Sequence, residues 1–132
     1  MRSLVCLFMS LLILNCESTD SHEQKYDPLE DGKIKIALYS DEGAHISCIT
    51  AAEKMFEWME YEVERVYADS VNYGNIKIYD LFYFPGGSSS FYREKINEEG
   101  RDKLRSLIDE GRGFIGTCAG AITLQKFKPG ME

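Results

Sequence analysis

The sequence has few of the residues that mark metal sites, disulfide frameworks or nucleic-acid surfaces. It contains two histidines and four cysteines in 132 residues, and their spacing matches no zinc site. The formal net charge is −7 and basic residues do not cluster, so nucleic-acid binding has no electrostatic support. We therefore expect no metal, no cofactor and no nucleic-acid partner.

The first residues are expected to form a targeting signal instead of part of a fold. Arg2 is followed by an apolar run over residues 4–14, which has the length of a signal peptide but is too short to span a bilayer. The order that follows resembles a bacterial lipoprotein signal, in which residues 1–15 are removed and Cys16 is lipidated. We expect an exported protein whose only membrane contact is the lipid on Cys16. An ordinary secretory signal cut nearby is the alternative.

Two further regions follow the signal. Residues 16–32 are polar and predict a tether, and residues 33–132 predict one domain in which apolar strands alternate with helices. The strands are expected at 33–39, 61–67 (nearer an edge), 79–84 and 113–117, and the clearest helices at 47–59, 98–110 and 119–125. Such alternation predicts a mostly parallel sheet of about four strands with helices on both faces. Ligands bind beyond the carboxyl ends of such strands, so the loops at 40–46, 85–90 and 117–119 should be neighbours.

The most informative stretch runs from residue 113 to residue 122. A short apolar strand leads into Gly116-Thr117-Cys118-Ala119-Gly120 and then into an apolar helix. Gly-x-Cys-x-Gly in this context is the cysteine form of a nucleophile elbow. A cysteine at the N-terminus of a helix is favoured as the thiolate. The pattern therefore predicts Cys118 as a nucleophile, and the alternative is a buried structural cysteine.

A thiolate that attacks a carbonyl group needs two N–H donors for the oxygen that becomes charged. The N–H of Ala119 is one candidate, and that of Gly86 or Gly87, in the Pro-Gly-Gly corner after the third strand, is the other. A plain turn that ends a strand is the alternative for this corner. A general base is harder to find, because His22 lies in the tether and loop histidines such as His45 are usually only solvated.

These segments together resemble a known family, the class I glutamine amidotransferase-like superfamily. The resemblance is carried by residues 34–39 with the loop at Gly43, 79–87 and 113–121. Within the superfamily they most resemble the N-terminal domain of fungal and yeast biotin–protein ligases, which also occurs as a stand-alone bacterial protein. The resemblance implies a flavodoxin-like three-layer α/β/α sandwich. It also implies that Cys118 occupies the nucleophile position and that Gly86, Gly87 and Ala119 form the oxyanion hole.

Members of the superfamily that hydrolyse glutamine take a His–Glu pair from a later segment. The sequence ends at Glu132 before such a segment, so we expect a fragment, the N-terminal part of the domain, without the usual glutaminase activity. Biotin ligation is not implied, because the ligase catalytic domain is a separate module.

Three functions fit the sequence. The first is a cysteine-dependent amide hydrolase or transferase, acting on a small molecule or an amide. The second is a non-catalytic surface module that binds a ligand or a partner. The third is a redox-responsive thiol of the ThiJ/PfpI sort. Cys48 bears on the third, because a disulfide between Cys48 and Cys118 is conceivable in an oxidising compartment; otherwise Cys48 packs in the core.

Overall fold

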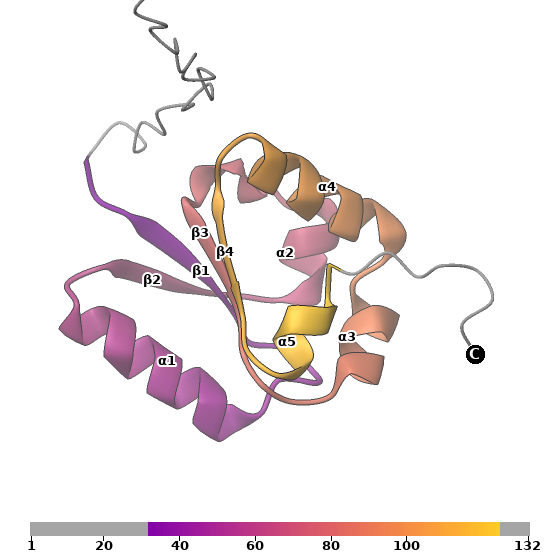
Figure 1. Ribbon diagram of the computed structural model, residues 1–132, viewed down its shortest axis with the longest axis horizontal. Helices are drawn as coiled ribbons and strands as arrows, with labels where there is room; N and C mark the ends of the chain where they lie inside the picture. Colours follow the sequence, from indigo (N-terminus) through magenta and orange to yellow (C-terminus); the bar gives the residue numbers. More distant parts are fainter. Residues whose placement is uncertain (1–31, 125–132) are drawn as a thin grey trace, which may run out of the picture.

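The computed structural model describes residues 32–124, in which strands and helices alternate along the chain (Figure 1). In order, the elements are β1 (Lys35–Tyr39), α1 (Ile46–Trp58), β2 (Glu62–Val66), α2 (Ala68–Tyr73), the 3₁₀ helix η1 (Ile76–Ile78), β3 (Leu81–Phe84), α3 (Ser89–Lys95), α4 (Glu98–Asp109), β4 (Gly113–Gly116) and α5 (Ala119–Ile122). The predicted signal peptide, Cys16 and the tether up to residue 31 lie outside the described residues.

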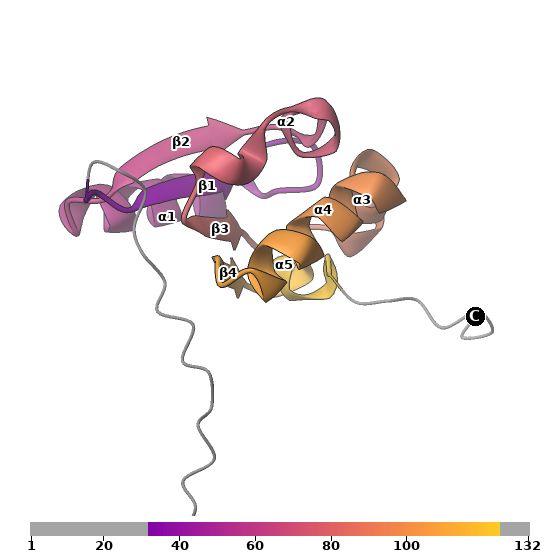
Figure 2. The same cartoon turned by 90° about the horizontal axis from the view of Figure 1, so that it is seen from above.

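Among the described residues, four strands form one sheet in the order β2-β1-β3-β4. All three neighbouring pairs are parallel, and Figure 2 shows the strands in this order. The order equals the first four positions of the flavodoxin-like arrangement. The predicted flavodoxin-like α/β fold is therefore confirmed, with β2 at an edge as its alternating pattern indicated.

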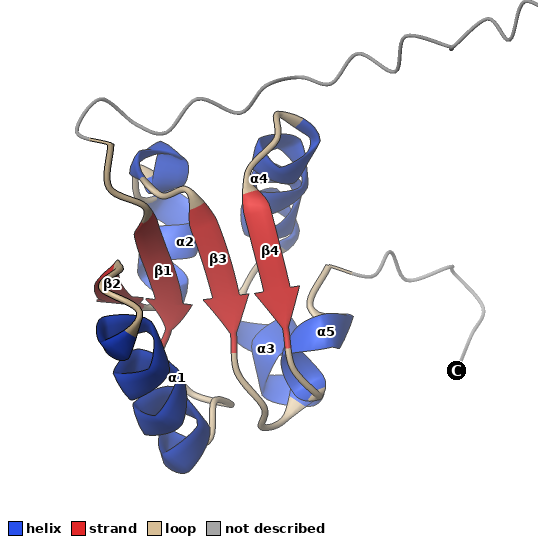
Figure 3. Ribbon diagram, turned by 60° about the vertical axis from the view of Figure 1, so that its left-hand side comes forward, coloured by secondary structure: helices blue, strands red, loops and turns tan. Residues whose placement is uncertain are grey.

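The two faces of the sheet are covered unequally. In Figure 3, α1 lies in front of the sheet at the side of β2 and β1, whereas α2, α3 and α4 lie behind it. Side chains alternate along β1, so that Ala37 and Tyr39 join the core beneath α2–α5, and Ile36 and Leu38 join the core beneath α1. Within residues 32–124 the core beneath α1 is the smaller of the two. The side chain of Ile115 on β4 is 40% exposed.

Aromatic rings fill the larger core near the carboxyl ends of the strands. The Tyr39 ring stacks on Phe84 at 4.9 Å between centroids, and Tyr92 of α3 meets Tyr39 edge-on at 5.1 Å. Such pairs add to the stabilisation that comes from burying the rings. The contacts of Tyr92 with these rings fix α3 next to the carboxyl ends of β1 and β3.

At the amino ends of the strands, Asp80 joins three neighbouring strands. Its side chain is buried, accepts the backbone N–H of Lys35 at 2.7 Å and lies 3.2 Å from Arg112 Nη1. Its backbone N–H donates to Lys35 O at 2.9 Å, and Gly113 N donates to Asp80 O at 2.8 Å. β3 starts at Leu81 and not at residue 79 as predicted, and Asp80 links the start of this strand to both of its neighbours.

The other strands and the two long helices lie within two residues of their expected bounds, and two further segments differ more. Residues 68–78, where the sequence pattern indicated neither a strand nor a clear helix, contain both α2 and η1. The last helix, expected over 119–125, ends at Ile122, and Gln125 lies outside the described residues. Within residues 32–124 no helix combines the length and the apolar character that crossing a bilayer requires.

Candidate functional site

Cys118 lies at the junction of β4 and α5 in an unusual backbone conformation. Its φ is 52° and its ψ is −115°, in a region where residues other than glycine are strained. Such strain costs about 1–3 kcal/mol and is found mostly where function requires it. The residue is exposed and its thiol is free. The junction therefore presents this thiol to solvent beyond the carboxyl end of the sheet.

Two glycines allow this sharp junction. A Cβ on Gly120 would lie 2.0 Å from the backbone oxygen of Phe84, and one on Gly116 would lie 2.6 Å from the backbone nitrogen of Ala121. No other residue fits without a shift of the backbone. The glycines on each side of Cys118 thus let α5 start directly against the ends of β3 and β4.

The loops after β1 and β3 are joined by backbone hydrogen bonds. His45 N donates to Gly86 O at 2.9 Å, and Ser88 N donates to Gly43 O at 2.7 Å. Ala44 and Gly87 form an isolated antiparallel bridge between these bonds. A Cβ on Gly87 would lie 1.8 Å from Gly43 O, so the approach requires glycine.

Gly86 brings this pair of loops to the cysteine. A Cβ placed on Gly86 would lie 3.6 Å from the Cβ of Cys118 and 3.5 Å from the Sγ of Cys48. Among the described residues, the backbone N–H groups of Gly86, Gly87 and Ala119 donate to no other protein group. Gly86 and Ala119 are buried, where unpaired N–H groups are rare. Donors that remain unpaired are therefore present beside the thiol.

Neither histidine is seen to serve as a base for Cys118. The Nδ1 atom of His45 lies 2.8 Å from Ser47 Oγ and accepts a hydrogen bond from Ser47 N, so the side chain caps α1. Within residues 32–124 no hydrogen bond reaches the Cys118 thiol, and His22 lies outside this range. The hydroxyl of Thr117, the residue before Cys118, lies 3.4 Å from the hydroxyl of Tyr83 on β3.

Sequence reasoning missed two side chains that support the site. Tyr92 donates from its buried hydroxyl to Pro85 O at 2.8 Å and thereby holds the Pro-Gly-Gly corner. Burial raises the pKa of Tyr92, and the charges of Cys48 and Cys118 raise it further. Asp41 accepts the N–H of Ala68 at 2.8 Å and joins the first loop to α2. Asp41 could have been found from the sequence, because it is an acidic residue just after a buried strand. Nothing in the sequence pattern indicated a role for Tyr92.

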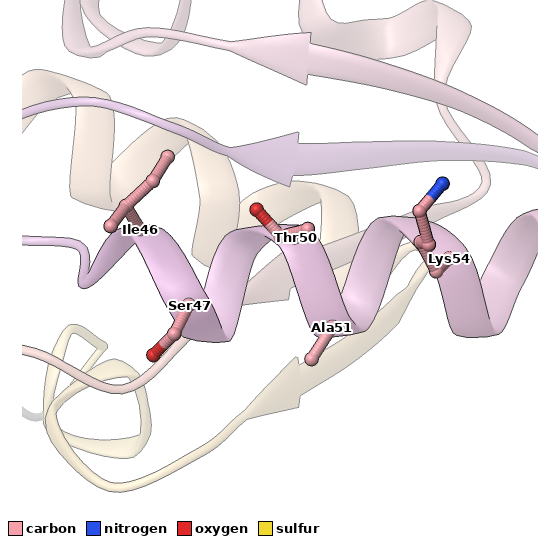
Figure 4. A pocket seen from close by; sticks show the side chains of 5 residues that line it. All are labelled: Ile46, Ser47, Thr50, Ala51 and Lys54. Carbon is pink, nitrogen blue, oxygen red and sulfur yellow. The ribbon is translucent and has the colours of Figure 1, made fainter.

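Two other features contribute no site at the cysteine. In the described ranges, no group of three or more His, Cys, Asp or Glu side chains is arranged to hold a metal ion. A shallow hollow runs along the outer side of α1, and Figure 4 shows that all five of its side chains come from this one helix: Ile46, Ser47, Thr50, Ala51 and Lys54. The hollow is thus separate from Cys118.

The fold and the comparisons define a glutamine amidotransferase-like domain. Residues 34–123 match the family described as "Biotin-protein ligase, N terminal", and the chain belongs to this family. An uncharacterized glutaminase of Schizosaccharomyces pombe is 45% identical over 49 residues, which are 36% of this chain and 21% of that protein. The match thus spans about a fifth of the relative's length. No solved structure matches the chain significantly. The resemblance inferred from the motifs is confirmed.

Proposed function

We propose that the domain hydrolyses or transfers a carboxamide of the glutamine type, with Cys118 as the nucleophile. The observation that carries this proposal is the strained, exposed thiol at the β4–α5 junction. The similarity to a glutaminase supports the carboxamide as substrate class. The substrate is a small molecule, and the scheme needs no cofactor.

The reaction proceeds through a thioester. The Cys118 thiolate attacks the carbonyl carbon, the C–N bond breaks, and ammonia leaves after taking up a proton. Water then attacks the thioester, which releases the carboxylic acid and restores the thiol. Every bond formed to sulfur in the first half is broken in the second, so the protein is unchanged.

The oxyanion is assigned to the backbone donors beside the thiol. Ala119 N–H and that of Gly86 or Gly87 have no protein acceptor among residues 32–124. Each donor of this kind typically contributes a factor of about 10²–10³ to the rate. The Tyr92 hydroxyl on Pro85 O holds the corner that carries the two glycine donors.

The described residues supply no general base in contact with Cys118, so proton transfer in this scheme passes through water. A positioned base typically contributes a factor of about 10²–10⁴. We therefore expect slow turnover but ready formation of a covalent adduct. The same observation supports the alternative function, a binding module that keeps the fold without completing the catalytic set.

Trapping with a diazoketone analogue of glutamine separates these functions. The full chain should gain one adduct on Cys118, located by peptide mapping, and ammonia release from glutamine should be lost in Cys118→Ser. Cys48→Ser is the matched control and should still form the adduct. An adduct without ammonia release would favour the binding module. Absence of an adduct on folded protein would refute both the nucleophile and the oxyanion assignments.

The proposal extends to location. The order of the first residues supports export with a lipid anchor on Cys16. In a bacterial host, labelled palmitate should appear on the protein and should be lost in Cys16→Ser. A protein that stays unlabelled and keeps residues 1–15 would overturn this part without affecting the chemistry at Cys118.

A further inference from the structure

Both thiols of the described residues, Cys48 and Cys118, lie close to Gly86. The position of a Cβ on Gly86 is 3.5 Å from Cys48 Sγ and 3.6 Å from Cys118 Cβ. Both cysteines are free thiols, Cys48 partly buried and Cys118 exposed. Since Gly86 has no side chain, none of its atoms fills the point that both cysteines approach.

Backbone contacts hold Cys48 at this place. Cys48 lies in the first turn of α1, where its N–H donates to His45 O at 2.9 Å. His45 N in turn donates to Gly86 O at 2.9 Å. The start of α1 is therefore tied directly to the residue that separates the two cysteines.

A second observation places both thiols in one environment. The buried Tyr92 hydroxyl has its pKa raised first by burial and then by the charges of Cys48 and Cys118. One phenol thus lies within electrostatic reach of both sulfur atoms. The pair differs in access, because solvent reaches Cys118 more freely than Cys48.

We propose that Cys48 is the resolving thiol for Cys118, so that a peroxide converts the pair to a disulfide that closes the site. The Cys118 thiol and one hydrogen peroxide give a sulfenic acid and one water. The Cys48 sulfur then attacks the sulfenic sulfur, the hydroxyl group leaves with the proton of the Cys48 thiol as a second water, and the S–S bond forms. A dithiol reductant restores both thiols by exchange.

Bond formation requires local movement. A disulfide needs Cβ atoms about 3.5–4.5 Å apart and Cα atoms under about 7 Å apart. Side-chain rotation at Cys48 and a shift of the short α5 turn provide the adjustment. The disulfide itself does not depend on hydrolysis, whereas its inhibitory effect rests on the proposed function.

Peptide mapping after mild oxidation tests the pairing. Full-length protein is treated with equimolar hydrogen peroxide, blocked with N-ethylmaleimide and digested without reductant. We expect a linked pair of Cys48 and Cys118 peptides, which dithiothreitol separates. In Cys48→Ser treated with excess hydrogen peroxide, Cys118 should instead proceed to sulfinic acid, because a second equivalent of peroxide oxidises the sulfenic acid when no resolving thiol remains.

Gly86→Ala is a sharper variant. Its methyl group would have only ordinary contacts, 3.5 Å or longer, so the fold should be kept while the gap between the thiols is filled. We expect disulfide formation to slow at least about tenfold, because the added methyl group would restrict the χ1 rotation of both cysteines and block their approach to each other. An unchanged rate would contradict the proposed path through this gap.

Two results would overturn the proposal in the wild-type chain. One is Cys118 as sulfinic acid beside a fully alkylated Cys48, and the other is a disulfide that joins either residue to another cysteine. Failure of the hydrolase is distinguishable, because the diazoketone adduct and ammonia release are measured on reduced protein. A linked pair in a protein without an adduct would support the redox pair alone.

Discussion

The two ends of the sheet are built in opposite ways. At the amino end, Asp80 is buried and bonded to both neighbouring strands through Lys35, Arg112 and Gly113. At the carboxyl end, Cys118 is exposed and strained, and the N–H groups of Gly86 and Ala119 have no acceptor within residues 32–124. The buried polar group at the amino end, Asp80, has its hydrogen bonds within the protein and joins the strands. The N–H groups near Cys118, where we propose the reaction, are left open to bind a ligand.

The largest effect on stability is expected from Asp80→Ala. It removes the carboxylate that accepts Lys35 N–H and faces Arg112, and breaking a buried pair of this kind costs about 3–5 kcal/mol. Urea unfolding should show this loss in the free energy of unfolding. Glu53→Gln, which removes an exposed pair with Arg65, is the control and should cost less than about 1 kcal/mol. If both variants lost the same unfolding free energy, the buried contacts of Asp80 would contribute no more than an exposed ion pair.

Gly120→Ala should have the next largest effect. Its Cβ would meet Phe84 O at 2.0 Å, and overpacking of this kind costs about 1–3 kcal/mol or more. Gly86→Ala lies at the same end and should leave the melting temperature nearly unchanged. If Gly120→Ala has the melting temperature of the wild type, α5 does not lie as close to β3 as described.

Cys118→Gly should stabilise the protein relative to Cys118→Ala. Both remove the thiol, but only glycine relieves the backbone at φ 52°, which stores about 1–3 kcal/mol and is partly offset by about 0.5–1 kcal/mol of glycine entropy. We expect a net difference of about 1 kcal/mol in unfolding free energy. Equal stability of the two variants would mean that the β4–α5 junction stores no strain.

The most gradual effect is expected from alkaline pH. Burial and a hydrogen bond with Glu64 raise the pKa of Tyr79, beside the amino-end junction, to about 12. Burial raises the pKa of Tyr39 and Tyr92, near the carboxyl end, as well. A raised folded pKa gives stability that is complete below the unfolded value, about 10, and is lost as the pH rises further.

Tyrosinate absorbance during a pH titration measures this directly. These three side chains should ionise later than free tyrosine, and the unfolding free energy should fall above about pH 10. An unfolding free energy that rises between about pH 10 and pH 12 would contradict the predicted direction of the pH dependence.

Much of the fold was predictable, because alternating and helical periodicity depend on local sequence. The four strands and the fold class follow from it, whereas the role of Asp80 does not, because Asp80 acts through contacts with residues distant in sequence. The motifs predicted Cys118 and Gly86 as site residues, and the structure places these two residues close together. The position of Cys48 next to them depends on the bonds between residues 43–45 and 86–88, which no local pattern encodes.

The proposed nucleophile is tested most directly by the rate at which iodoacetamide alkylates Cys118. The measurement uses the full chain with Cys48→Ser at pH 7, compares folded with urea-unfolded protein, and assigns the label by peptide mapping. A thiol activated by its place at the β4–α5 junction predicts faster alkylation in the folded protein. Slower alkylation than in the unfolded chain would contradict the assignment of Cys118 as the nucleophile.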